Sequence, residues 1–475
     1  MIRLEIEGAP TAAERWAFEL LVDLCRLLPV DPAAEGGVTA RLTDAAPGQP
    51  DFTPGAGSVL VDRAALRRIV DIAGAAQEQR VTTRDRHGRV PGSANPMVQS
   101  GLERQLPLHQ TGEQFFRAVQ AAAGDRRVVR LGGWPDGHRW AAAFTHDVDI
   151  VRGWPLFALL RWSELLRKGE FERVASAIES ACRAIGSRPV QQGVEAILAL
   201  ESEAGVRATW FVLAGIPTLG GWRRGDVTYR LDAPEARRLL ELILSAGHEI
   251  GLHGSLETRD SAQLMAEERE RLTRVTGTAP DGVRQHFLRL DPGHTPAGAA
   301  RAGFRYDASF GFAERNGFRL GLADVIPIWQ ESAGQPLPLL EAPLCWMDRI
   351  LSKYQGQEDP ERWVDDAMEL AASCRDVGGL WVGLWHPNVI PALGFPGALT
   401  AFRQLLRRIM DDDPYVAPLA EIVCWRAARR ALRGRVGKEG RVELVGDRRG
   451  GWRVVLEELP GGRISSHSWP EPTCG

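Results

Sequence analysis

The segment Thr145-His146-Asp147-Val148-Asp149 directly follows the apolar run Ala141-Ala142-Ala143-Phe144. This pattern predicts a buried strand whose end carries two carboxylates and an imidazole. Ionised carboxylates are not buried without a partner, because the loss of hydration is too costly. The cluster is therefore either a salt-bridged strand terminus or helix cap, or a place where a cation, a metal or a catalytic task uses both carboxylates.

Three further short apolar segments end on, or contain, a histidine. They are 247–255 with His253, 282–288 with His286, and 379–388 with His386. In a barrel of parallel strands, the strand ends on one face form the active site, so we expect these side chains to meet Asp147 and Asp149. Six of the ten histidines fall in or near the four segments: His146, His248, His253, His286, His294 and His386.

In this order the segments resemble the motifs of the polysaccharide deacetylase family, whose catalytic domain is called NodB-like or carbohydrate esterase 4-like. Thr145 to Asp149 is similar to the first motif in a Thr-His-Asp-x-Asp variant. The later motifs are similar to 253–257, 284–287, 306–310 and 384–386, and the resemblance covers roughly residues 135 to 425. The chain departs from the family pattern at Glu257, which stands where a second histidine is usual.

The resemblance implies an α/β fold, a distorted (β/α)7 NodB-like barrel, and a divalent metal ion. Asp149 and His253 are then expected to hold the metal, and Glu257 is expected to complete the site, with His146 and His286 as alternatives. Zinc is the default ion, although a site of histidines and carboxylates also suits iron, cobalt, nickel or manganese.

The resemblance also implies the catalytic residues. Asp147 would be the general base and Arg284 would pair with it, which keeps the carboxyl ionised. His386 would be the general acid, and Asp307 would hold its ring in the required tautomer. Each residue also has an ordinary structural explanation, because Arg284 can lie on the surface, Asp307 can cap a turn and His386 can be a hydrogen-bonded loop residue.

The rest of the chain predicts three parts. We expect an N-terminal accessory α/β region at 1–130, the catalytic barrel at 135–430 and a small C-terminal β appendage or tail at 435–475. Segment 84–89 is expected to be a solvated charged loop, and residues 154–187 two inserted helices packed on the barrel rim. Further expected elements are helices at 11–28, 63–77, 234–245, 261–276 and 360–377, and a strand at 206–214.

Composition excludes some partners. The formal net charge of −3 gives no electrostatic footprint for nucleic acid or for an anionic membrane, so the arginine-rich stretches are expected to be surface residues or locally paired. No stretch approaches the roughly 20 apolar residues of a transmembrane segment, and the charged first 21 residues do not resemble a secretory signal. The six cysteines are dispersed, which predicts reduced thiols and no thiolate zinc site. Cytoplasmic residence is the resulting expectation, while the oligomeric state is left open.

The leading functional hypothesis is a metal-dependent hydrolase that removes an acetyl group, most often N-linked, from a carbohydrate or amino-sugar substrate such as a surface-polysaccharide precursor. Two alternatives are a non-catalytic carbohydrate-binding degenerate deacetylase, suggested by Glu257, and a hydrolase of another C–N bond on a small metabolite. Aromatic residues available for sugar stacking are Trp154, Trp210, Trp222, Tyr229, Trp346 and Trp385, although such residues also serve as core packing.

Overall fold

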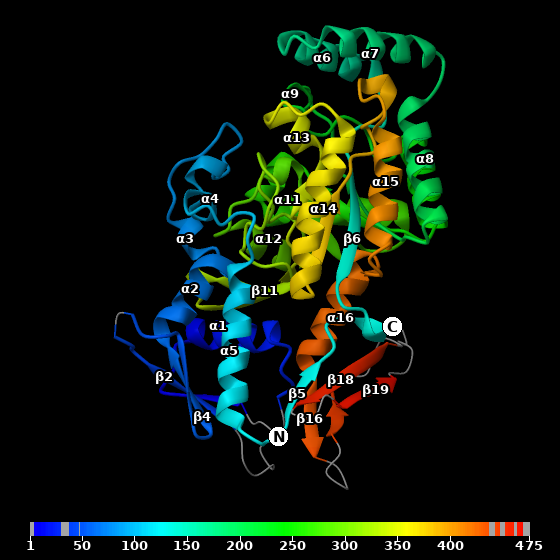
Figure 1. The fold of residues 1–475 in the computed structure, drawn as a ribbon. Coiled ribbons are helices and arrows are strands. Elements are labelled where there is room, and N and C mark those ends of the chain that lie inside the picture. The colour runs from blue at the N-terminus through cyan, green and yellow to red at the C-terminus, as the bar shows by residue number, and fades with distance from the viewer. Residues whose placement is uncertain are drawn as a thin grey trace.

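A curled sheet of ten strands forms the centre of the protein (Figure 1). The computed structural model describes residues 4–29, 38–46, 48–436, 442–446, 452–459 and 463–468. The strand order is β11-β12-β10-β9-β8-β7-β6-β14-β13, and β15 also pairs with β6. Every neighbouring pair from β12 to β13 is parallel, and only β11 is antiparallel to its neighbour. The distorted α/β barrel of parallel strands predicted from the sequence is confirmed, and the sheet is a curled half-barrel.

The strands of this sheet are short and largely buried, as expected where helices cover a parallel sheet. In β6 every residue is buried, from the alanine run to Val148. The bounds are β6 Ala141–Val148, β7 Thr209–Leu213, β8 Glu249–Gly254, β9 Gly282–Gln285, β10 Tyr306–Asp307, β11 Ile326–Gln330, β12 Gln335–Glu341, β13 Trp346–Met347, β14 Leu380–Leu384 and β15 Tyr415–Val416.

Helices of the barrel match several predicted ranges. The bounds are α8 Pro189–Glu203, α9 Leu219–Arg223, α10 Pro234–Ser245, α11 Ala262–Thr276, α12 Thr295–Arg301, α13 Asp348–Tyr354, α14 Pro360–Val377, α15 Ala398–Met410 and α16 Leu419–Ala431. The helices predicted at 234–245 and 360–377 have the same ends in the structure. These boundaries could be predicted because both helices have proline at the first helical position. A glycine in the left-handed conformation, Gly378, also follows α14.

The inserted helices predicted at 154–187 are confirmed as a hairpin of α6 (Trp154–Arg167) and α7 (Phe171–Arg183). Leu165, Val174 and Ala177 form a small core between them. Beneath the hairpin lies the short helix η6 (Pro391–Leu393), and the next residue, Gly394, lies close to Leu165 and Ala177. The hairpin occupies one end of the molecule (Figure 1).

The N-terminal region has its own sheet of order β1-β2-β4-β3, at the opposite end from the hairpin (Figure 1). Its elements are β1 Leu4–Glu7, α1 Ala12–Leu24, β2 Val38–Thr43, β3 Phe52–Gly55, β4 Ser58–Asp62, α2 Arg63–Ala73, α3 Ala76–Gln79, α4 Pro96–Gln99, α5 Pro107–Ala123 and β5 Val128–Leu131. Buried contacts join it to the barrel: Glu78 pairs with Arg319, and the rings of Trp16 and Trp329 lie 5.7 Å apart.

The C-terminal strands are β16 Arg433–Val436, β17 Val442–Val445, β18 Arg453–Leu459 and β19 Arg463–Ser468. β18 pairs with β19 and also with β5, so the C-terminal segment shares a sheet with a strand that precedes the barrel. Part of the expected appendage, including 469–475 and Cys474, lies outside the described residues. The five cysteines within the described residues are free thiols. No described helix has the length and apolarity needed to cross a bilayer.

Candidate active site

The end of β6 presents alternate side chains to opposite sides of the sheet, as strand geometry requires. Thr145 and Asp147 face the site, whereas His146 faces the covering helices. Both His146 ring nitrogens are bonded there, Nδ1 2.7 Å from the carbonyl oxygen of Trp385 and Nε2 2.9 Å from Glu201 Oε1. His146 is fully buried, so it supports the strand from behind and is not available as a site ligand.

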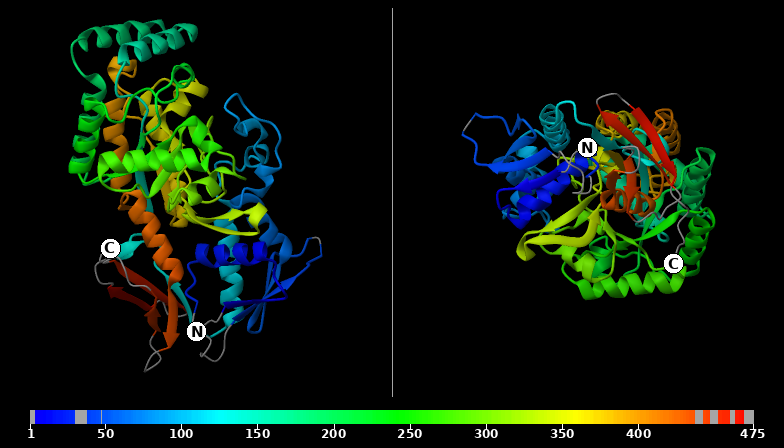
Figure 2. Two further views of the ribbon diagram at one scale, coloured as in Figure 1. Left: turned by 180° about the vertical axis from the view of Figure 1, so that it is seen from behind. Right: turned by 90° about the horizontal axis from the view of Figure 1, so that it is seen from below.

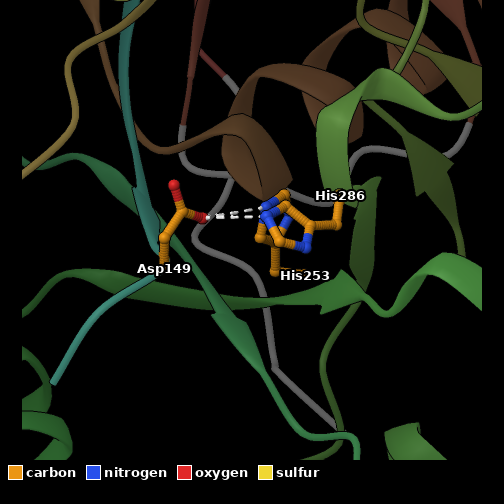
Figure 3. A group of neighbouring side chains, drawn as sticks. All are labelled: Asp149, His253 and His286. Carbon is orange, nitrogen blue, oxygen red and sulfur yellow. Dashed lines mark ion pairs between the residues drawn. The ribbon is translucent and has the colours of Figure 1, made fainter. Parts of the chain in front are cut away.

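Asp149, His253 and His286 converge just beyond the strand ends (Figure 3). Asp149 Oδ1 lies 3.4 Å from His253 Nε2 and 3.6 Å from His286 Nε2. One ligand-type atom from each residue falls within 4.8 Å of the others. Asp149 Oδ1 is buried and has no hydrogen-bond partner among the described residues. An unpartnered carboxylate oxygen facing two imidazole nitrogens fits a divalent cation.

The far nitrogen of each imidazole is fixed by a hydrogen bond. His253 Nδ1 donates to the carbonyl oxygen of Arg284 over 2.9 Å, and His286 Nδ1 lies 3.2 Å from Asp226 Oδ1. A carbonyl or carboxylate on one nitrogen sets the tautomer and directs the lone pair of the other nitrogen, Nε2, into the site. The same Asp226 oxygen accepts from the backbone N–H of Leu256. Asp226 therefore ties two segments of the site together, a role that its loop position did not signal in the sequence.

Carboxylates and imidazoles lie close enough in this cluster to shift the pKa values of one another. Burial alone would raise the pKa of Asp149, but His253, His286 and His386 hold it well below its ordinary value. Burial would likewise lower the pKa of His253, yet the carboxylates of Asp147 and Asp149 raise it. The carboxylates of Asp147 and Asp149 thus favour positive charge beside His253, which is what a cation site requires.

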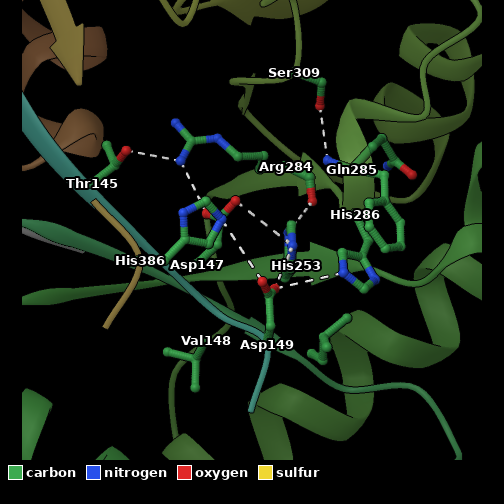
Figure 4. A network of polar contacts seen from close by, with 12 residues as sticks. Thr145, Asp147, Val148, Asp149, His253, Arg284, Gln285, His286, Ser309 and His386 are labelled. Carbon is green, nitrogen blue, oxygen red and sulfur yellow. Dashed lines mark hydrogen bonds and ion pairs between the residues drawn. The ribbon is translucent and has the colours of Figure 1, made fainter. Parts of the chain in front are cut away.

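Asp147 is held by Arg284, as predicted, within a buried network (Figure 4). Arg284 Nη1 donates to Asp147 Oδ1 over 3.0 Å and to Thr145 Oγ1 over 2.8 Å. Its Nε donates to the carbonyl oxygen of Ala308, and its guanidinium lies 4.3 Å from the centre of the Phe211 ring. The other carboxyl oxygen, Asp147 Oδ2, lies 3.7 Å from His253 Nε2 and faces the cluster.

His386 lies on the other side of Asp149, with Nε2 3.7 Å from Asp149 Oδ2. Its Nδ1 lies 2.7 Å from Asp348 Oδ1, and its backbone N–H donates to Asp348 Oδ2 over 2.8 Å. Burial would lower the pKa of His386, but Asp348, with Asp149 and Asp147, raises it to about 9. The imidazole therefore carries a proton at neutral pH.

The prediction that Asp307 orients His386 is wrong, because Asp348 does so. Asp307 accepts a hydrogen bond from Ser309 Oγ and stands beside Glu341 on the neighbouring strand. Burial raises the pKa of Asp307 to about 6. Sequence reasoning missed Asp348, although the apolar segment Cys345-Trp346-Met347 before it has the same pattern as β6, an apolar strand that ends in a carboxylate.

The prediction that Glu257 completes the cation site is also wrong. Its side chain is 52% exposed and pairs with Arg224 at 2.9 Å. After β8, the chain enters the short helix η3 (Leu256–Arg259), and this turn directs Glu257 to solvent. His286, which the sequence analysis gave as an alternative third ligand, takes that position in the cluster.

The N-terminal region reaches the site through segment 84–89, which is only partly the solvated loop that its charges predicted, because Arg84 and Arg86 are exposed but Arg89 is not. Arg89 is buried, pairs with Asp85 and donates to the carbonyl oxygen of Phe287. The ring of His87 stacks on Phe287, which in turn stacks on His286, with centroid separations of 5.0 and 4.2 Å. Phe287 has a φ of 57°, an uncommon backbone conformation that these contacts from a distant segment hold in place.

A cavity of about 140 Å³ opens at the cluster. Its lining includes Arg89 and Phe287 on one side and Ile350, Lys353 and Tyr354 of α13 on another. Of the aromatic residues proposed for sugar stacking, Trp210, Tyr229, Trp346 and Trp385 are buried packing residues and Trp222 is largely exposed. The cavity lining includes none of the six.

No protein-family model matches the chain, and no curated protein sequence matches it. Similar solved structures include a protein of Mycobacterium smegmatis described as a polysaccharide deacetylase, at 24% identity and a TM-score of 0.42, covering 62% of this chain and 92% of that one. The chitin deacetylase of the fungus Colletotrichum lindemuthianum has 14% identity and a TM-score of 0.32, covering 61% and 88%. Peptidoglycan deacetylase PdaC of Bacillus subtilis has 14% identity and a TM-score of 0.29, covering 61% and 93%.

Proposed function

We propose that this protein is a metal-dependent hydrolase that removes an acetyl group, N-linked in the first instance, from an amino-sugar substrate. The observation that carries the proposal is the convergence of three groups of side chains at one cavity. Asp149, His253 and His286 offer a cation site, while the ion-paired Asp147 and the protonated His386 flank it. Hydrolysis of an amide needs an activated water, a base and an acid, and this set supplies all three.

The donor set fits a metal ion. Two imidazole Nε2 atoms and one unpartnered carboxylate oxygen suit zinc, and also iron, cobalt or nickel. Asp149, His253 and His286 would hold the ion, which would polarise the acetyl carbonyl and lower the pKa of a water molecule bound to it. Because all three positions are filled without Glu257, the absent second-motif histidine no longer favours a degenerate binding protein.

Two residues would carry out the proton transfers, Asp147 as the base and His386 as the acid. Asp147 would accept a proton from the attacking water, and the hydrogen bond from Arg284 orients the carboxyl for that step. His386 would donate a proton to the leaving nitrogen, because an amine leaves readily only after protonation. Asp348 holds the His386 ring by Nδ1, so that Nε2 faces the cluster.

The cavity supports a small reacting unit. The cavity at the cluster is small, at about 140 Å³, and Arg89 and Phe287 are among the residues that line it. A small cavity favours a substrate that presents a chain end or a single sugar, such as a precursor, over the middle of a long polymer. The same small size favours the second candidate, a hydrolase of another C–N bond on a small metabolite.

The test combines metal content with product release. We expect about one divalent metal ion per chain by mass spectrometry in the wild-type protein, and its loss in His253→Ala. Acetate released from acetylated amino sugars should fall at least about a hundredfold in Asp147→Asn, which keeps the shape of the site but removes the base. A wild-type protein that takes up no added metal, or an unchanged rate in Asp147→Asn, would refute the proposal. Release of a different acid from non-sugar amides would favour the second candidate.

A further inference from the structure

The α6–α7 hairpin exposes large apolar side chains in unusual number. Leu159 and Leu160 are more than half exposed, and Phe171 and Ile185 are 69% and 75% exposed. Single exposed apolar residues are common, but a group of them on one projecting unit marks an interaction surface. We call the group the apolar platform: Leu159, Leu160, Leu166, Phe171, Ile178 and Ile185.

The fold does not need these side chains for packing. The hairpin is held by a neighbouring face, where Ala158 and Leu165 of α6 and Val174, Ala177 and Ala181 of α7 are buried. On α7 the exposed Phe171, Ala175, Ile178 and Cys182 recur at intervals of four and three residues, followed by Ile185 just after the helix. This spacing is a second apolar stripe along one helix face, next to the stripe that holds the hairpin together, because Val174, Ala177 and Ala181 are each directly followed by a residue of the exposed stripe.

The apolar platform lies at the catalytic end of the barrel. α6 begins only five residues after Asp149, and Lys168 at its end donates to the carbonyl oxygen of Ser352 in α13. α13 lines the cavity, and its Arg349, also in the lining, pairs with Glu164 of α6. The loop after β7 adds exposed Ile216, Leu219 and Trp222 at the same ends of the strands. Figure 2 shows the hairpin at the end farthest from the N-terminal and C-terminal sheets.

Positive charge accompanies the apolar platform. Residues 151–188 contain seven lysines and arginines against four glutamates, and 216–225 contain two arginines and no acidic residue, in a chain whose net charge is −3. Arg167, Arg188 and Arg223 are exposed and have no ion-pair partner among the described residues, whereas the exposed Arg152, Arg183 and Arg224 each pair with a glutamate. Exposed apolar residues on a helix with surrounding cations are the composition of a helix that lies in the interface of an anionic membrane.

We propose that the α6–α7 hairpin docks this protein on the surface of an anionic lipid bilayer, with the apolar platform in the headgroup region and the cavity beside the membrane. A second copy of the chain is a poorer partner, because it would bring two positively charged ends together. If the proposed function also holds, the substrate is an acetylated sugar carried by a membrane lipid; this second step rests on the proposed function, whereas the docking does not.

Vesicle sedimentation of the full chain tests the docking without any assay of activity. Binding is compared on vesicles of phosphatidylcholine alone and of phosphatidylcholine with phosphatidylglycerol. We expect clear binding to the anionic vesicles and a fall in the partition coefficient of at least about tenfold in Leu159→Ser/Leu160→Ser and in Phe171→Ser/Ile178→Ser. Leu60→Ser is the matched control, because Leu60 is 42% exposed in the N-terminal sheet, and its binding should equal that of the wild type.

Binding that is equal for the paired variants and the wild type, or absent from anionic vesicles, overturns the proposal. Sedimentation velocity without lipid tests the alternative that a second copy of the chain binds the apolar platform. Self-association of the wild type that the paired variants abolish, with no vesicle binding, would assign the apolar platform to a second copy. All variants replace exposed residues, so circular dichroism should report unchanged melting. Vesicle binding without any deacetylation would leave the docking intact and refute only the proposed function.

Discussion

Asp348→Asn provides a direct test of how the site keeps His386 protonated. Asp348 accepts from both Nδ1 and the backbone N–H of His386, and it is the main group that raises the pKa of that imidazole from 6.5 to about 9. A rise from 6.5 to about 9 corresponds to about 3 kcal/mol of preference for the protonated ring. Asparagine keeps the shape but removes the charge, so we expect the pKa of His386 to return to about 6.5 or lower.

The consequence for a general acid depends on pH. At pH 8 a ring with a pKa of 9 is about 91% protonated, whereas a ring with a pKa of 6.5 is about 3% protonated, a difference of about thirtyfold. At pH 6 the same change reduces the protonated fraction only about 1.3-fold. The loss of kcat/KM in Asp348→Asn should therefore be small at pH 6 and steep at pH 8.

Two measurements test whether Asp348 keeps His386 protonated. NMR titration of the His386 ring in protein stripped of metal by a chelator reports the pKa, and acetate release reports the activity. Asp307→Asn is the control, because Asp307 is bonded to Ser309 and not to His386. The reasoning is refuted if the His386 titration is the same in Asp348→Asn and the wild type, or if the activity falls by equal factors at both pH values.

Three further predictions concern other buried groups. Burial raises the pKa of Glu268 from 4.5 to about 7, so the stability from its protonation is present below pH 4.5 and is lost as pH rises through 7. From pH 5 to 8 the free energy of unfolding should fall by about 2 to 3 kcal/mol relative to Glu268→Gln. His286→Ala should lose bound metal, whereas Glu257→Ala should retain it. Glu78→Ala should lower the free energy of unfolding by about 3 to 5 kcal/mol, because it leaves the buried charge of Arg319 unpaired.

Each of these predictions has a control and a contrary outcome. Glu270→Gln, an exposed neighbour of Glu268, should follow the wild type in urea unfolding at every pH; parallel curves for Glu268→Gln would contradict the assigned protonation. Equal metal content in the His286 and Glu257 variants would refute the assignment of the third ligand. For Glu78, Glu19→Ala on the exposed face of α1 is the control, and equal melting of the two variants would show that the buried pair is dispensable.

Local sequence signals were enough for the elements with strong boundaries. The ends of α10 and α14 follow from proline at the first helical position, and the end of α14 also follows from Gly378. The burial of β6 follows from its alanine run. The parallel sheet follows from alternation of strands and helices, and this in turn placed Asp147, Asp149, His253, His286 and His386 at one end of the barrel.

The roles of residues that depend on contacts between distant segments could not be predicted from the sequence in the same way. Asp348 and Asp226 orient His386 and His286, but each lies far along the chain from its partner, and carboxylates are common at helix starts and in loops. Segment 84–89 has the composition of a solvated loop, yet Arg89 is buried because Asp85 and the carbonyl oxygen of Phe287 satisfy its guanidinium. Glu257 occupies a motif position, but the turn after β8 directs it to solvent.

The sequence by itself determined that the ends of β6, β8, β9 and β14 carry chemistry, because strand period and chain order dictate which side chains emerge at the catalytic end. Only the tertiary structure decided which of those side chains share a partner. Hydrogen bonds and ion pairs act over about 3 to 4 Å, and a sequence does not specify separations that small between segments a hundred residues apart. Those separations select His286 over Glu257 at the cation site, and Asp348 over Asp307 at His386.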